Sequence, residues 1–224
     1  RPIGQGKADT SIRWVEKQKN AVTCVSAYGM LHVRPISEEI LRVTFGPAAK
    51  IQKLAEEKDV KQTFEFQEER DKIRIRTARI SAEIEKASGA ITFFDRTGKK
   101  LLAEKKNMPR QIDQARGQVW NYFDWTREER LSAKGILKDD RLPLRNTAKY
   151  ICYGNKTKRL PYIHSSLGYG IAVAADGDVL CCNIPMYGPY VSVMGTDVID
   201  FYFIASDSEA EVIDTYLQFM NEKV

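Results

Sequence analysis

The chain has 224 residues, of which 43% are hydrophobic and 29% are charged, and its formal net charge is +5. These values are typical of a soluble globular protein with a sizeable core, and no apolar run is long enough to span a bilayer. The cations are interleaved with acids, as in residues 53–61 and 68–76, whereas a nucleic-acid-binding protein concentrates its cations on one face. Composition therefore argues against both a membrane partner and a nucleic-acid partner.

Cysteine and histidine form no metal-site pattern. Four cysteines are present: Cys24, Cys152, Cys181 and Cys182. None belongs to a C-x-x-C pair, and the adjacent Cys181 and Cys182 should point to opposite faces of a strand. The two histidines, His32 and His164, lie far apart in the sequence. With no phosphate-binding glycine loop or nucleophile elbow either, the sequence predicts no metal and no cofactor.

The first half of the chain predicts a series of short β-strands after a polar N-terminal extension, residues 1–20. Residues 40–45 alternate cleanly, with Leu41, Val43 and Phe45 on one face. The predicted strands of this half cover residues 21–26, 30–36, 40–45, 63–66, 72–77, 80–85, 90–94 and 100–103. Residues 51–61 fit either a short helix or an exposed loop.

The middle of the chain, residues 105–138, breaks this rhythm and carries an aromatic cluster: Trp120, Tyr122, Phe123 and Trp125. Exposed rings beside charged residues could stack on sugars, so Trp120 and Trp125 are candidate sugar-stacking residues. Aromatic clusters more often fill the seam between two sheets, which is the alternative interpretation.

Residues 160–183 predict the interior of a sheet. Two strands are separated only by Leu167 and Gly168, and an Asp176-Gly177 turn predicts a second hairpin into a third strand. Gly170 suggests a kink or a close backbone approach. The three strands cover residues 162–166, 169–174 and 179–183.

The C-terminal part predicts two more strands, 190–194 and 198–204, and then a helix. The segment VIDFYFI is almost continuously apolar, as expected for a strand covered on both faces. Ser208 and Glu211 have the spacing of a capping box. The chain is therefore predicted to be mainly β, an antiparallel β-sandwich over residues 21–205 followed by a C-terminal helix over residues 206–224.

No pattern in the sequence predicts catalytic residues. A sugar hydrolase needs two carboxylates that face each other. Asp139 and Asp140 are adjacent in a predicted loop, and Asp124 and Glu128 would share a face only if their segment is helical. All four are most simply solvated surface acids. His164 lies on a predicted strand, where a satisfied histidine is commoner than a catalytic base.

Five segments carry a resemblance to a known family. They are ILRVTFGP (40–47), ISAEIEKASGAITFFDRTGKKLLAE (80–104), LPLRNTAKY (142–150), LPYIHSSLGYGIAV (160–173) and VIDFYFIASDSEAEVIDTYLQF (198–219). In this order and spacing, the chain resembles the N-terminal domain of glycoside hydrolase family 31, the α-glucosidases and α-xylosidases. The resemblance implies a galactose-mutarotase-like β-sandwich (a supersandwich) that precedes a (β/α)8 catalytic barrel.

The resemblance also implies a function. Both catalytic aspartates of the family belong to the barrel, so this chain would be a non-catalytic domain of a retaining α-glycosidase, inactive alone. Its partners would be the barrel of the same polypeptide and an α-linked glucoside or xyloside. Asn146 and Thr147 match a loop that reaches the sugar pocket, although a plain loop turn with Asx or hydroxyl capping is the alternative. The sequence departs from the family at Ala148, where many members have an aspartate, and at residues 131–135.

Two other functions stay open from the sequence. One is a free-standing carbohydrate-binding module that uses the Trp120–Trp125 aromatics. The other is an aldose epimerase, which would need a histidine and a glutamate facing each other in a sugar cleft. The first ten residues contain no apolar signal core, so any secretion signal was removed or never existed, and the compartment is open. The sugar, the linkage, the oligomeric state and the state of the cysteines have no signature in the sequence.

Overall fold

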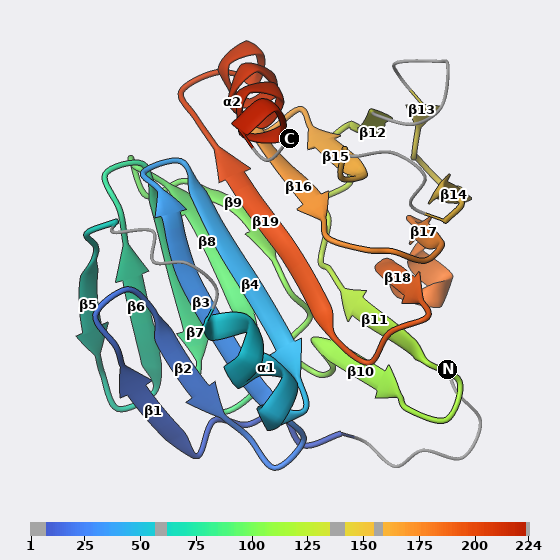
Figure 1. Ribbon diagram of the computed structural model, residues 1–224. Helices are drawn as coiled ribbons and strands as arrows, with labels where there is room; N and C mark the ends of the chain where they lie inside the picture. The colour runs from blue at the N-terminus through green and yellow to red at the C-terminus, as the bar shows by residue number, and fades with distance from the viewer. Residues whose placement is uncertain (1–7, 57–61, 135–141, 155–158, 223–224) are drawn as a thin grey trace.

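The computed structural model describes residues 8–56, 62–134, 142–154 and 159–222, which fold into three antiparallel sheets and two α-helices (Figure 1). The largest sheet has nine strands. In spatial order they are β1 (Trp14–Lys17), β2 (Val22–Val25), β3 (Met30–Ser37), β4 (Ile40–Gly46), β19 (Ile199–Ala205), β16 (Tyr169–Val173), β15 (Tyr162–Ser165), β12 (Leu131–Lys134) and β13 (Leu142–Pro143).

The other two sheets have five strands each. The first, in spatial order, contains β5 (Glu65–Glu68), β6 (Lys72–Arg76), β7 (Ile80–Glu85), β8 (Ile91–Asp95) and β9 (Lys100–Ala103). The second contains β10 (Arg110–Asp113), β11 (Gln118–Tyr122), β18 (Tyr190–Met194), β17 (Val179–Cys182) and β14 (Ala148–Cys152). A single bridge between Glu104 and Phe123 joins the end of β9 to the end of β11.

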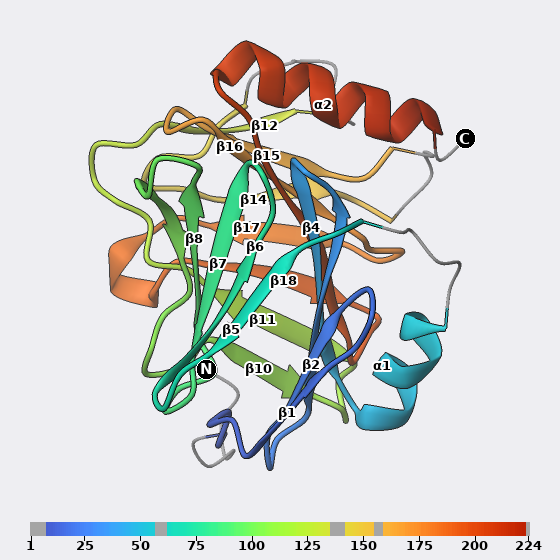
Figure 2. The same cartoon turned by 90° about the vertical axis from the view of Figure 1, so that its left-hand side faces the viewer.

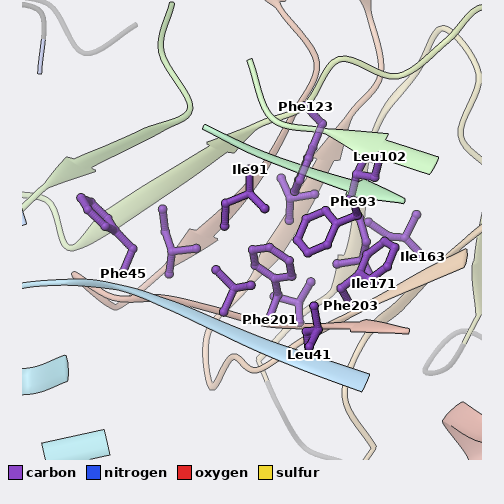
Figure 3. Close-up of a cluster of buried hydrophobic side chains, with 14 of the residues drawn as sticks. Leu41, Phe45, Ile91, Phe93, Leu102, Phe123, Ile163, Ile171, Phe201 and Phe203 are labelled. Carbon is purple, nitrogen blue, oxygen red and sulfur yellow. The ribbon is translucent and has the colours of Figure 1, made fainter. Parts of the chain in front are cut away.

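One hydrophobic core lies between the nine-stranded sheet and the two five-stranded sheets (Figure 3). Phe203 of β19 stacks on Phe93 of β8, with ring centroids 4.1 Å apart. Phe201, also on β19, meets Phe123, which follows β11, edge to face at 6.1 Å. Both five-stranded sheets therefore pack on the same face of the nine-stranded sheet, which makes the molecule a β-sandwich, as predicted.

The two helices cover the outer face of the nine-stranded sheet (Figures 1 and 2). α2 (Glu209–Glu222) packs on β16 and β19, where Tyr216 stacks on Tyr162 at 4.2 Å and donates a hydrogen bond to the Leu160 carbonyl at 2.6 Å. α1 (Ala48–Ala55) lies on β3 and β4 and buries Ile51. Neither of these two helices of the described chain has the length and apolar composition of a bilayer-spanning segment.

β19 confirms the prediction of a strand covered on both faces. Phe201 and Phe203 belong to the core of the sandwich, whereas Tyr202 and Ile204 belong to a second cluster beneath α2. Half of the predicted capping box is present, because the Glu211 N–H donates to the Ser208 hydroxyl at 3.2 Å. The Glu211 carboxylate accepts the Asp207 N–H at 3.3 Å instead of the Ser208 N–H.

The predicted turns of residues 160–183 have different outcomes. β15 and β16 form the expected hairpin across Leu167 and Gly168. A side chain at Gly170 would lie 2.2 Å from the Tyr162 ring, which confirms the close approach. The prediction of a second hairpin is wrong, because β16 and β17 belong to different sheets. Gly177 is needed there for space, since a Cβ atom would lie 1.9 Å from the Met194 carbonyl oxygen.

Several elements differ from the sequence prediction. The ambiguous segment near residue 51 is helical, but α1 begins earlier, at Ala48. β1 lies within the residues assigned to an N-terminal extension and pairs with β2. Residues 105–154 contain five strands that the sequence did not predict, β10, β11, β12, β13 and β14.

Candidate functional site

Four connections between strands meet around a pocket of about 440 Å³, which we call the Trp125 pocket. The β11–β12 connection supplies residues 124–127 and Glu129, and the β13–β14 connection supplies Arg145 and Asn146. Lys105 comes from the β9–β10 connection and Asn183 from the β17–β18 connection. The pocket thus brings together two of the residues predicted from the sequence, Trp125 and Asn146.

Trp125 is held in place from the core side. Its ring stacks on Phe123 with centroids 5.4 Å apart and planes 21° from parallel, and the residue is half-buried. One side of the indole thus packs on the core of the sandwich while the residue lines the pocket. An aromatic ring fixed in this way can offer an apolar surface to a ligand at little entropic cost.

The buried carboxylate of Glu129 fixes the backbone that follows Trp125. Glu129 Oε1 accepts the Thr126 N–H at 2.7 Å, and Oε2 accepts the hydroxyls of Ser165 at 2.5 Å and Tyr169 at 2.8 Å. Burial, together with the neighbouring Glu129, raises the pKa of Tyr169 well above its ordinary value, so this phenol stays protonated and donates. The network ties the pocket wall to β15 and β16.

Asn146 lies at the tip of the β13–β14 connection with a φ of 50°, the one positive φ outside glycine in the described residues. Asparagine tolerates this conformation better than most residues, so its identity fits a tight turn as well as a sugar contact. Thr147 is half-buried and does not line the pocket. Its carbonyl accepts the Asn183 N–H at 2.8 Å. A sugar contact for Asn146 or Thr147 therefore stays a prediction.

Trp120 is not brought to the Trp125 pocket. It lies within β11, where Val119 points into the core, so alternation places Trp120 on the outer face of the second five-stranded sheet. Only 9% of the residue is exposed. In this position its ring has no open face for a sugar, so Trp125 is the better of the two stacking candidates.

A larger hollow of about 1270 Å³ lies on the outer face of the nine-stranded sheet between α1 and α2, and we call it the outer groove. On its floor, Arg42 donates two hydrogen bonds to Asp200, at 3.0 and 2.8 Å, and lies over the Tyr202 ring at 5.4 Å. Next to this floor, burial and the charges of Arg34 and Arg42 lower the pKa of His32 to about 4, so this imidazole is neutral at pH 7.

Among the described residues, the candidate pairs from the sequence do not meet in the Trp125 pocket. In this part of the chain, no cluster of histidine, cysteine, aspartate and glutamate could hold a metal ion. Asp139 and Asp140 lie outside the described residues, and of the other pair Asp124 lines the Trp125 pocket whereas Glu128 does not. His164 does meet a glutamate, with Nε2 3.1 Å from Glu209 Oε1, but neither lines the Trp125 pocket as an epimerase pair would.

Three cationic residues of the Trp125 pocket were missed by the sequence analysis: Lys105, Arg127 and Arg145. They lie on three different connections, so no local pattern links them.

Comparison with solved structures shows where this fold occurs, although no protein-family model and no curated protein matches the sequence. The chain is similar to a GH31 alpha-xylosidase from a soil metagenome, at 20% identity and a TM-score of 0.69, covering 89% of this chain and 33% of that one. A GH31 dextranase from Flavobacterium johnsoniae matches at 17% identity and a TM-score of 0.72, covering 96% of this chain and 28% of that one. A cycloalternan-forming enzyme from Listeria monocytogenes matches at 15% identity and a TM-score of 0.76, covering 95% of this chain and 22% of that one.

The three comparisons agree in their coverage. Nearly all of this chain is matched, yet it spans a third or less of each of these solved chains. At these identities the likeness shows the fold. The structural resemblance expected from the five sequence segments is therefore confirmed, and the chain has the fold of one part of larger glycoside hydrolases.

Proposed function

We propose that this chain is the non-catalytic N-terminal β-sandwich domain of a retaining α-glycosidase of family 31, and that it packs on the catalytic barrel of the same polypeptide. The observation that carries this proposal is the coverage, since the whole sandwich corresponds to a minor part of larger glycosidases. Among the described residues, the candidate carboxylates Asp124 and Glu128 do not meet in the Trp125 pocket, which fits the same role. The barrel would supply the nucleophile and the acid/base.

The domain's contribution to the reaction would be to form one wall of the sugar pocket. Trp125 would present its ring to the apolar face of a sugar, and Asn146 would exchange hydrogen bonds with sugar hydroxyls, since an amide both donates and accepts. Glu129 would act as a positioning residue, because it fixes the backbone next to Trp125. Rigid positioning of this kind raises the rate by holding the sugar in its reactive geometry.

The barrel would cover the outer groove. Its floor holds the Arg42–Asp200 ion pair, whose side chains are 10% and 12% exposed, and α2 forms one side through Phe219. The α2 side is mostly polar, since Thr215, Gln218 and Glu222 line it beside Phe219. Contacts between domains of one chain are more polar than obligate interfaces. α2 would then continue the chain toward the barrel.

The substrate would be a terminal α-linked glucose or xylose. Two of the similar structures are an alpha-xylosidase complexed with xylose and a dextranase complexed with glucose. Hydrolysis would proceed through a covalent glycosyl-enzyme and retain the anomeric configuration.

The test compares this chain with the polypeptide that also contains the barrel. The isolated chain should not hydrolyse aryl α-glucosides or α-xylosides, whereas the longer protein should. In the longer protein, Trp125→Ala and Asn146→Ala should each lower kcat/KM about tenfold, the effect of one lost contact of about 1.4 kcal/mol. Tyr153→Ala, which removes an exposed aromatic residue outside the pocket, is the matched control. Turnover by the pure isolated chain, abolished by mutating one of its own acids, would refute the proposal.

A free-standing carbohydrate-binding module is the second candidate, because Trp125 lines a pocket formed by this chain alone. Titration with α-glucans or xyloglucan fragments, followed by tryptophan fluorescence, separates the two. Saturable binding that is lost in Trp125→Ala favours the module. No binding by the isolated chain favours the structural domain.

A further inference from the structure

The Trp125 pocket contains cations that no residue described by the structure neutralises. Lys105, Arg127 and Arg145 line it, and none makes an ion pair or a side-chain hydrogen bond with a described residue. Elsewhere in the sandwich, arginines such as Arg42, Arg74 and Arg110 are paired with carboxylates within 3 Å. Among the described residues, this hollow is therefore lined by three cations without a counter-charge.

The carboxylates of the pocket do not balance these cations. Glu129 is buried, and both of its oxygens already accept hydrogen bonds from Thr126, Ser165 and Tyr169. Asp124 is the one exposed acid of the lining, and it makes no ion pair with a described residue. The accessible charge is thus three cations against one anion.

We propose that the pocket binds an anionic glycoside, one that carries a carboxylate or a sulfate ester. The guanidinium groups of Arg127 and Arg145 would bind the anion, and the Trp125 ring would take the apolar face of the sugar. The amides of Asn146 and Asn183 would bind the remaining hydroxyls. The inference rests on the proposed function in taking the ligand to be a glycoside, and it narrows the preferred ligand from a neutral glucoside or xyloside to a derivative that carries a negative charge.

The chemistry of arginine supports an anion over a neutral sugar. A guanidinium group presents paired N–H donors that match the two oxygens of a carboxylate or a sulfate, and such charge-assisted bonds are about twice as strong as neutral ones. In a concave site, the surrounding protein screens this attraction less than open solvent does. A neutral sugar would leave the same guanidinium groups hydrated and gain less from them.

The test is a titration of this chain by calorimetry and tryptophan fluorescence with four probes. They are methyl α-glucuronide, methyl α-glucoside 6-sulfate, methyl α-glucoside and inorganic sulfate. We expect one or both of the charged glycosides to bind about tenfold more tightly than the neutral glucoside, and to lose affinity as sodium chloride rises. The carboxylate and sulfate probes distinguish the two sources of negative charge.

Variants assign the effect to the pocket. Arg127→Gln and Arg145→Gln should each weaken binding of the charged glycoside about tenfold while leaving the far-UV circular dichroism unchanged, since both residues are exposed. Arg130→Gln is the matched control: this exposed arginine lies on the same connection but does not line the pocket. An equal loss in Arg130→Gln would overturn the assignment.

The other outcomes are equally decisive. Equal affinity for the neutral and the charged glycosides overturns the inference. So does binding of inorganic sulfate as tightly as of the sulfated sugar, because it would indicate a plain anion site. No binding of any probe also overturns it. Binding of a glycoside by this chain would also count in favour of the carbohydrate-binding module. The proposed function is decided separately, by the activity of the longer protein on aryl glycosides.

Discussion

At the scale of single residues, the most constrained group in the molecule is the carboxylate of Glu104. Its side chain and that of Arg110 are both fully buried, and Arg110 donates to it at 3.1 and 2.5 Å. The Ile91 N–H and the Asn121 amide complete its hydrogen bonds at 2.9 and 2.7 Å. Glu104 thus joins β8, β10 and β11 at the seam between the two five-stranded sheets, where the Glu104–Phe123 bridge also lies.

Glu104→Gln should destabilise the protein by about 3–5 kcal/mol, because it leaves the charge of Arg110 buried without a counter-charge. The measurement is the midpoint of urea unfolding. Glu83→Gln is the matched control, since Glu83 also accepts two hydrogen bonds from an arginine, Arg74, but both side chains are partly exposed. There the expected cost is about 0–1 kcal/mol. Similar costs for the two variants would contradict the prediction.

At the scale of elements, α2 depends on a stack of two tyrosines on the outer face of the nine-stranded sheet. Tyr162 of β15 lies between Gly170 on the neighbouring strand and Tyr216 on the helix. Tyr162 is fully buried, so its ring cannot swing outward to make room. The absence of a side chain at Gly170 therefore lets the helix dock.

Gly170→Ala should destabilise the protein by about 1–3 kcal/mol, the usual cost of overpacking, because the new methyl group would lie 2.2 Å from the Tyr162 ring. The displaced ring would no longer stack on Tyr216. Amide hydrogen exchange should consequently become faster in α2 than in β6 and β7, which lie in the opposite layer. Unchanged exchange in α2 would show that the stack does not hold the helix.

The same scale shows which elements could be predicted from the sequence. Strands such as β4 and β7 alternate apolar and polar residues, and β19 is apolar throughout, so hydrophobic pattern was sufficient. β10 and β11 lack such a pattern because they bury polar side chains: Arg110, Gln111, Asp113 and Asn121. Their buried polar side chains are satisfied by partners such as Glu104, which bonds Arg110 and Asn121, and no hydrophobic pattern reveals such contacts.

The candidate site was predictable only in part, for a related reason. Trp125 and Asn146 could be named from an aromatic cluster and from a family resemblance. Their meeting at one pocket, and the presence of Arg127 and Arg145 beside them, depends on how two connections distant in sequence pack together. Trp120 belongs to the same cluster as Trp125, but the alternation of β11 turns it to another face.

At the scale of the whole molecule, the three sheets share one core rather than two. The stack of Phe203 on Phe93 ties the nine-stranded sheet to the first five-stranded sheet, and the contact of Phe201 with Phe123 ties it to the second (Figure 3). Glu104 joins the two smaller sheets to each other. No sheet can lose its partners without exposing part of the common core, so we expect all three to unfold together.

Phe203→Ala tests this cooperativity. It should cost about 3–5 kcal/mol, because it removes a fully buried ring from the contact between layers. Unfolding in urea is followed in a Trp14→Phe background, because Trp14 lies on β1 of the nine-stranded sheet. Tryptophan fluorescence then reports Trp120 and Trp125 near the second five-stranded sheet, and far-UV circular dichroism reports all three sheets. The two probes should give one midpoint in the original chain and shift equally in the variant. This holds although Phe93, on which Phe203 stacks, belongs to the first five-stranded sheet and the two tryptophans lie near the second. Two separate midpoints would mean that the second five-stranded sheet unfolds independently and that the sandwich consists of two cooperative units.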